Sequence, residues 1–129
     1  MTTALVVLFL LAHGFVHFMV WLPHPAPDPA GPAPPFAPDH SAVLTMASVP
    51  ATTTRELSVV LAIGSGGAFI LAGLAVTFGG GWAVPLAVVA GGLGLVLKTL
   101  FFNPWLLLGI GLDALVLSAA LVEWPVSLA

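Results

Sequence analysis

Asp113 is the residue of this sequence with the clearest potential for chemistry, because it stands in the middle of an otherwise uncharged apolar run. The run covers residues 105–122 and is long enough to cross a bilayer. A carboxylate at the centre of a membrane helix costs about 2.5–3.5 kcal/mol on insertion scales. Such a residue therefore has a polar partner or a task. We expect Asp113 to fix helix register, by accepting a hydrogen bond from His13 or Ser65 or by pairing with Lys98. The alternative is that it titrates, coordinates a cation or orients a histidine.

Two histidines in a different apolar run are natural partners for this carboxylate. His13 and His17 are four residues apart, so they project from one face of a helix. Together with Asp113 they resemble a two-histidine, one-carboxylate ligand set. His13, His17 and Asp113 are thus candidate ligands for a divalent metal, although the same spacing also fits histidines that only form hydrogen bonds. Haem is less favoured, because no other predicted span offers a histidine on the facing side.

The composition places these residues in a membrane protein. The 129-residue chain has two basic and five acidic residues, and 60% of it is apolar. Soluble domains carry roughly 25% charged residues, so this chain cannot cover itself with a water-compatible surface. The absence of a basic patch argues against nucleic-acid binding. The absence of cysteine excludes disulfides, thiolate metal sites and cysteine catalysis.

Four apolar segments are long enough to be membrane helices, which predicts an all-α fold. They cover residues 4–22, 57–78, 82–102 and 105–122. The last three are joined by very short turns, so neighbouring helices must be antiparallel. A loop over residues 23–55 separates the first two spans, and eight prolines occur within residues 23–38. We predict an integral membrane four-helix bundle forming a single transmembrane domain over residues 1–129, with one long proline-rich loop.

Local signals suggest how the helices begin and end. Thr53, followed three residues later by Glu56, is typical of a capping box and predicts the start of the second long helix. Residues 41–51 are more apolar than the rest of the loop and predict a short interfacial helix, capped by Ser41 or Asp39. The alternative for this region is a plain surface linker. The first span could also be a signal peptide, but it lacks a basic beginning.

Counting helical turns from the tryptophans at the span ends predicts a polar layer inside the bundle. His13 is eight residues from Trp21 and Asp113 is eight residues from Trp105, so both lie about 12 Å from the loop side. Ser65 reaches the same depth from the second long helix and Gly94 from the third. Lys98 lies one turn nearer the loop, level with His17. We expect Lys98 to extend its ammonium toward the interface, as lysines near helix ends commonly do.

The sequence also resembles a known group of proteins. The segment His13-Gly14-Phe15-Val16-His17 and the segment from Asn103-Pro104-Trp105 through Gly109 to Asp113 are similar to motifs of an uncharacterised group of small bacterial four-helix membrane proteins. That group has an HG-x-x-H motif in its first helix. The resemblance covers most of the chain outside the proline-rich loop and implies the same fold. It implies no particular activity.

These observations lead to three functional hypotheses. The first is a non-enzymatic membrane protein whose His13/Asp113 layer binds or relays a cation or proton. The second is a purely structural or interaction subunit, in which the layer only specifies packing. The third is a membrane enzyme acting on a lipid or quinone, and it ranks last because no nucleophile motif or nucleotide site supports it.

The surroundings of the protein follow from the same features. We expect a multi-pass protein of the bacterial inner membrane, in contact with the lipid bilayer. We also expect a homo-oligomer or association with other membrane subunits, because four short helices leave little room for a solute pathway. Arg55 and Lys98 both fall on the side of the long loop, which favours a cytoplasmic loop and outward-facing termini. The alternative is an external loop, for which a proline-rich, mildly acidic sequence is equally natural.

Overall fold

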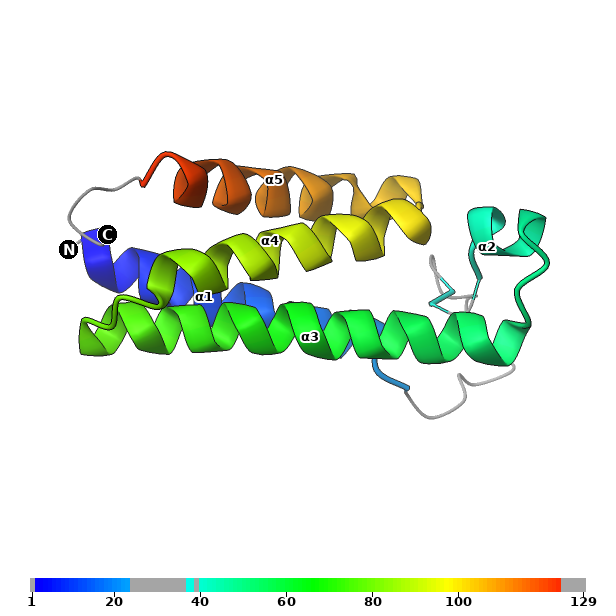
Figure 1. The fold of residues 1–129 in the computed structure, drawn as a ribbon, viewed down its shortest axis with the longest axis horizontal. Coiled ribbons are helices and arrows are strands. Elements are labelled where there is room, and N and C mark those ends of the chain that lie inside the picture. The colour runs from blue at the N-terminus through cyan, green and yellow to red at the C-terminus, as the bar shows by residue number, and fades with distance from the viewer. Residues whose placement is uncertain (1, 24–36, 39, 124–129) are drawn as a thin grey trace, which may run out of the picture.

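The computed structural model describes residues 2–23, 37–38 and 40–123, and this part of the chain folds into helices (Figure 1). The helices are α1 Thr2–Trp21, α2 Ala42–Met46, α3 Ala51–Phe78, α4 Ala83–Leu100, the 3-10 turn η1 Pro104–Leu106, and α5 Leu107–Leu121. Four helical segments are long and apolar enough to cross a membrane, with η1 and α5 counted as one. The predicted all-α bundle of four apolar helices is confirmed, and it indicates a multi-pass membrane protein.

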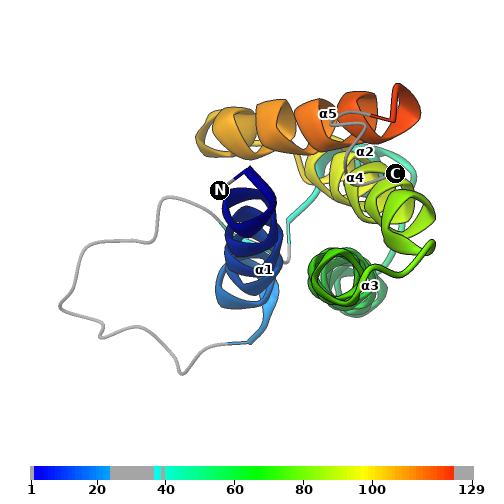
Figure 2. The same cartoon turned by 90° about the vertical axis from the view of Figure 1, so that its left-hand side faces the viewer.

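The four long helices are not packed equally closely. α3 packs along both α1 and α4, and α4 packs along α5. α1 and α5 are not among the closely packed pairs. Successive helices α3, α4 and α5 run antiparallel, as predicted (Figure 1). Seen from the end where α1 begins, α5 crosses the bundle obliquely (Figure 2). Side chains must therefore bridge the space between α1 and α5.

The turns between helices follow from local residue chemistry. α3 ends at Gly79, whose φ of 68° is a left-handed conformation that glycine adopts without strain. The N–H of Gly80 donates to the Ala75 carbonyl at 2.8 Å, which completes a Schellman-type cap. Between α4 and α5, the Asn103 side chain accepts from the Trp105 N–H at 2.9 Å. Asn103 thus caps η1 ahead of Pro104.

The predicted start of α3 was wrong. The helix begins at Ala51, with Pro50 at the N-cap and no side-chain capping bond. Thr53 and Glu56 therefore lie inside the first turns instead of forming a capping box. Proline explains the earlier start, because its fixed φ is compatible with a position at the beginning of a helix. The loop predicted for residues 23–55 is correspondingly shorter.

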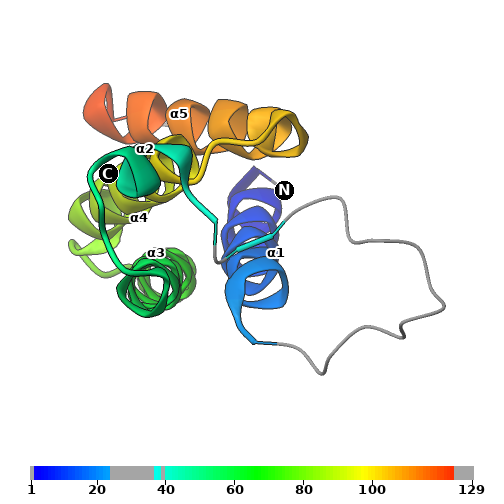
Figure 3. The ribbon, with the colours of Figure 1, turned by 90° about the vertical axis from the view of Figure 1, so that its right-hand side faces the viewer.

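The prediction of a short helix within the loop is confirmed by α2, which is fastened to the bundle by its cap. The Ser41 side chain accepts from the Leu44 N–H at 3.2 Å, as an N-cap does. The same hydroxyl donates to the Leu100 carbonyl at the end of α4, at 2.5 Å. α2 therefore lies against the loop-side end of α4, at the opposite end of the bundle from Thr2 (Figures 1 and 3). Asp39, the other proposed cap, lies outside the described residues.

Glycines set the two closest helix crossings. A Cβ added to Gly14 of α1 would lie 2.8 Å from the Gly66 carbonyl oxygen of α3. A Cβ added to Gly91 of α4 would lie 2.9 Å from the Asp113 carbonyl oxygen of α5. Both approaches are too close for any side chain. Small residues allow such approaches in lipid, where packing replaces the hydrophobic drive. The crossings bring the helices together next to His13 and Asp113.

The tryptophans do not all behave as interface anchors. Trp82 and Trp105 are 74% and 73% exposed, as expected of side chains that face lipid headgroups. Trp21 is only 2% exposed and packs edge-on against Phe101, at a ring distance of 5.5 Å. Trp21 therefore closes the loop-side end of the core and does not face the lipid headgroups. Trp124 lies outside the described residues.

Candidate functional site

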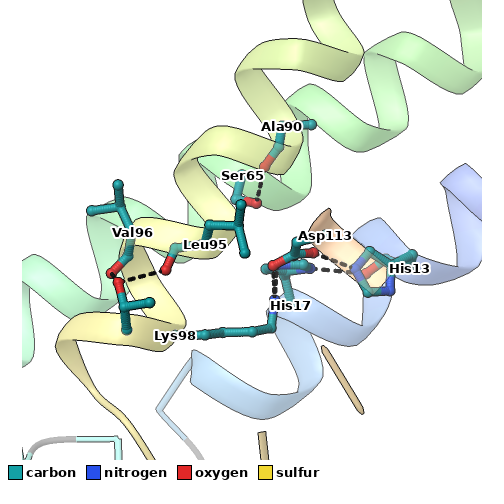
Figure 4. A network of polar contacts seen from close by, with 9 residues as sticks. His13, His17, Ser65, Ala90, Leu95, Val96, Lys98 and Asp113 are labelled. Carbon is teal, nitrogen blue, oxygen red and sulfur yellow. Dashed lines mark hydrogen bonds and ion pairs between the residues drawn. The ribbon is translucent and has the colours of Figure 1, made fainter. Parts of the chain in front are cut away.

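Asp113 is the centre of a buried polar network that joins three helices. Its side chain is fully buried in α5. One carboxylate oxygen, Oδ1, lies 2.7 Å from Nε2 of His13 on α1. The other, Oδ2, accepts from Nζ of Lys98 on α4 at 2.5 Å. Figure 4 shows His13 and Lys98 each pointing at a different oxygen of the carboxylate. The predicted meeting of His13 and Asp113 is thus present in the structure, and it spans the gap between α1 and α5.

His17 extends the network back to its own helix. Its Nδ1 donates to the His13 backbone carbonyl one turn earlier, at 3.0 Å. Its Nε2 lies 2.8 Å from Nζ of Lys98. Because a backbone carbonyl only accepts, Nδ1 carries the proton, and Nε2 is free to accept from the ammonium. This tautomer is assigned from the hydrogen-bond partners.

The hydrogen bonds are consistent with one assignment of protons to the four side chains. An ionised Asp113 accepts from Lys98 and from the Nε2–H of His13, while a neutral His17 accepts from Lys98. With neutral histidines and a protonated lysine, the four side chains carry no net charge. Their exposed fractions are 0% for Asp113, 1% for His17, 5% for Lys98 and 6% for His13. Such balance is what a low-dielectric interior requires, because an unpaired buried charge costs several kcal/mol.

The prediction that Lys98 extends to the interface was wrong. Its ammonium turns into the bundle and binds both Asp113 and His17. Space for the lysine stem comes from Gly109 of α5, where an added Cβ would lie 2.7 Å from Cε of Lys98. Space for the carboxylate comes from Gly94 of α4, where an added Cβ would collide with the Asp113 side chain. Two glycines on facing helices thus shape the ion pair.

Two phenylalanines enclose the histidines, and neither was predicted from the sequence. The Phe69 ring of α3 lies edge-on to His13 at 4.7 Å and tilted against His17 at 5.4 Å. Phe9 stacks on His13 from one turn earlier in α1, at 5.5 Å. Phe69 is four residues after Ser65 and shares its helix face, which is the signal that could have identified it. These rings exclude lipid and water from the imidazoles.

Ser65 is buried, as expected for the polar layer, but does not join the network. It is fully buried, and its hydroxyl donates to the Ala90 carbonyl of α4 at 2.9 Å (Figure 4). The possibility that Asp113 accepts from Ser65 is therefore wrong. Ser65 instead joins α3 to α4. No buried side-chain nitrogen or oxygen among the described residues lacks a hydrogen-bond partner.

The predicted metal ligands are brought together. One potential ligand atom from each of His13, His17 and Asp113 lies within 4.8 Å of the others. All three side chains are of types that bind divalent metals. The Lys98 ammonium, however, already contacts both His17 and Asp113. A metal bound by all three residues would have to displace this internal cation.

The other ionisable side chains among the described residues lie away from the network. His40, Arg55, Glu56 and Glu123 are exposed. His24 and Asp28, in the proline-rich segment, lie outside the described residues. The described ionisable groups are thus divided between an exposed set and the one buried network.

Comparisons with known proteins identify no family. No protein-family model, no curated protein and no solved structure matches the chain. Without a matching family, the protein is characterised by its four apolar helices and its buried pair of histidines.

Proposed function

We propose that the network of His13, His17, Lys98 and Asp113 holds a proton within the membrane interior and exchanges it. The observation that carries this proposal is the unbroken chain of contacts between four ionisable side chains, from 2.5 to 2.8 Å in length. Ionisable residues within membrane helices are typical of proton and ion pathways. Here the chain starts on α1, crosses to α5 and returns to α1 through α4.

The contacts allow a proton to move without any helix moving. Lys98 already donates to Nε2 of His17, so transfer along that hydrogen bond would give a histidinium and a neutral amine. A proton arriving at Asp113 would neutralise the carboxylate and weaken its hold on Lys98. Each step changes the partner of its neighbour, which couples the protonation of all four groups. The enclosing phenylalanines favour transfer within the network over exchange with lipid-exposed surfaces.

Infrared spectroscopy on the reconstituted protein tests this proposal. With ¹³C-labelled aspartate, acidification should raise the protonated carboxyl band of Asp113 and shift the histidine ring bands in one common transition. Asp113→Asn should remove that band and alter the histidine transition. Glu123→Gln, which changes an exposed carboxylate, should leave both intact. Histidine bands that do not respond to acidification in the wild-type protein would contradict proton exchange and favour a purely structural network.

A divalent metal at His13, His17 and Asp113 is the second candidate, and the 4.8 Å clustering of their ligand atoms favours it. Lys98→Met removes the competing ammonium while keeping an unbranched side chain. If these residues form a masked metal site, this variant should bind Zn²⁺ at least 10-fold more tightly than the wild type. Calorimetric titration measures the difference, with Lys98→Met/His17→Ala as the control that removes a ligand. Equal affinity in wild type and Lys98→Met would eliminate the metal.

Several broader features belong to the same proposal. We propose that residues 1–129 form a single transmembrane domain of the bacterial inner membrane, with the long loop in the cytoplasm. We further propose that it works as a homo-oligomer or with other membrane subunits, since the network fills the middle of a single copy. The His13-to-His17 motif supports membership of the small bacterial group that the sequence resembles. A role as an enzyme acting on a lipid or quinone has less support.

A further inference from the structure

An apolar groove opens between α1 and α5 at the end of the bundle opposite the long loop. It has a volume of about 340 Å³ and is lined from all four long helices. Its lining residues are Thr2, Leu5, Val6, Phe9, Leu10, Val76, Ala83, Val84, Ala87, Leu115, Val116, Ala119, Ala120 and Glu123. The groove lies where α1 and α5 lack close packing, and Figure 2 shows α5 running obliquely to α1 at this end.

The polarity of the groove changes along its length. Among the described residues that line it, Thr2 and Glu123 are the only ones with polar side chains, and both lie at the end where α1 begins and α5 finishes. The inner wall contains Phe9, Leu10 and Val116. Leu10 lies eight residues along α1 from Thr2, so the wall extends about 12 Å into the membrane. The groove therefore has a polar mouth at the membrane surface and a hydrocarbon interior.

The chemistry of the groove restricts its occupant. The groove is bounded by helices long and apolar enough to cross a membrane, so the hydrocarbon of the bilayer is the medium next to it. A quinone head would leave its carbonyls without donors, because the inner wall has no polar side chain. A flexible hydrocarbon chain has no such requirement.

We infer that this groove binds one acyl chain of a membrane phospholipid, with the lipid headgroup beside Thr2 and Glu123. The chain would fill the space that α1 and α5 leave between them. Its inner end would contact Phe9, which stacks on His13 at 5.5 Å. The lipid would therefore complete the packing on one side of the polar network. This inference depends on the shape of the groove and is independent of proton exchange.

Variants that fill the groove test the inference. Ala119→Phe places a ring among the lining residues, whereas Ala12→Phe places the same ring on the exposed face of α1. Each protein is exchanged into lipid-free dodecyl maltoside, supplied with dioleoylphosphatidylcholine and weighed by native mass spectrometry. Wild type and Ala12→Phe should bind a first lipid with equal affinity. Ala119→Phe should bind it at least 10-fold more weakly.

A second variant that fills the groove controls for misfolding of Ala119→Phe. Ala87→Leu narrows the groove from α4 and should weaken binding in the same direction, with unchanged helical circular dichroism. Equal first-lipid affinity in the wild type and both filling variants would overturn the inference. So would a dimer in the wild type that both filling variants abolish, because a second copy would then occupy the groove. Preferential retention of a quinone over the phospholipid would also overturn it.

Discussion

On the loop side of the bundle α1 and α5 are joined through the Asp113 network, whereas on the terminus side they are separated by an apolar groove. The first region is specific: no buried side-chain nitrogen or oxygen of the described residues lacks a hydrogen-bond partner, and the Asp113 carboxylate lies directly against Gly94 of α4. The second is permissive, with a lining of Ala, Val and Leu side chains. The helix pair α1 and α5 thus combines a specific electrostatic contact in one region with a permissive apolar surface in the other. Substitutions should therefore have unequal effects in the two regions.

The largest effect is expected from breaking the ion pair on one side only. Asp113→Leu leaves the Lys98 ammonium buried without its carboxylate and should lower the free energy of unfolding by about 3–5 kcal/mol. Lys98→Met should have a similar effect by stranding the carboxylate. The double variant should be less destabilised than either single variant, because it buries no unpaired charge. Chemical unfolding in bicelles gives the double-mutant cycle. Additive losses would show that the two side chains are not paired.

An intermediate effect is expected from filling the space that the ion pair uses. Gly94→Ala would push a methyl group into the Asp113 carboxylate and should cost about 1–3 kcal/mol, as overpacking does. Gly92→Ala is the matched control, since an added Cβ there meets nothing within 4 Å. That substitution should be neutral or stabilising, because alanine favours helices over glycine. Equal stabilities for the two variants would contradict the close contact between α4 and the carboxylate.

The same comparison applies to the lysine. Gly109→Ala would crowd the Lys98 stem, whereas Gly111→Ala has open space around it. We expect the first to destabilise by about 1 kcal/mol, less than Gly94→Ala, because a flexible stem can move aside. The second should be neutral. Thermal unfolding in the same detergent measures both, and a larger loss at Gly111 would contradict the assigned helix faces.

A small effect is expected from Ser65, which lies near the network without joining it. Ser65→Ala removes one hydrogen bond to the Ala90 carbonyl and should cost about 0.6 kcal/mol, the average for such bonds between membrane helices. The infrared transitions of the histidines should stay unchanged. A shift in those transitions would place Ser65 within the network after all.

The smallest effect is expected on the groove side. Leu115→Ala shortens a side chain that borders the groove and is 60% exposed. The change in unfolding free energy should stay within about 0.5 kcal/mol, as for other exposed positions. A loss as large as that of Gly94→Ala would show that the groove side is as tightly packed as the loop side.

Much of the fold and part of the site could be predicted from the sequence. Span lengths and hydropathy gave the four helices, and turn counting from Trp21 and Trp105 placed His13 level with Asp113. The same counting placed Lys98 level with His17, but its direction could not be predicted. Whether a lysine turns toward the interface or inward depends on the space that Gly109 leaves on the facing helix. That space exists only after α4 and α5 pack.

Other features depend on contacts between helices, which the order of residues along the sequence does not reveal. Phe69 resembles any other apolar residue of α3 until its ring meets both imidazoles. Ser65 was expected in the same layer as Asp113, yet its hydroxyl donates to the Ala90 backbone carbonyl instead. The groove results from the oblique course of α5, which the hydropathy pattern does not indicate. The matching depth of His13 and Asp113 was therefore predictable, whereas the direction of the Lys98 side chain and the hydrogen-bond partner of Ser65 were not.

Nitrogen-15 NMR of the two histidine rings, in protein reconstituted into bilayers, tests the central claim most directly. A closed network requires different neutral tautomers: His13 with a proton on Nε2, and His17 with a proton on Nδ1 and a bare Nε2. Asp113→Asn should change the His13 signals most, with a smaller change at His17 through Lys98. Identical, rapidly exchanging tautomers at both rings, unaffected by Asp113→Asn, would contradict the account.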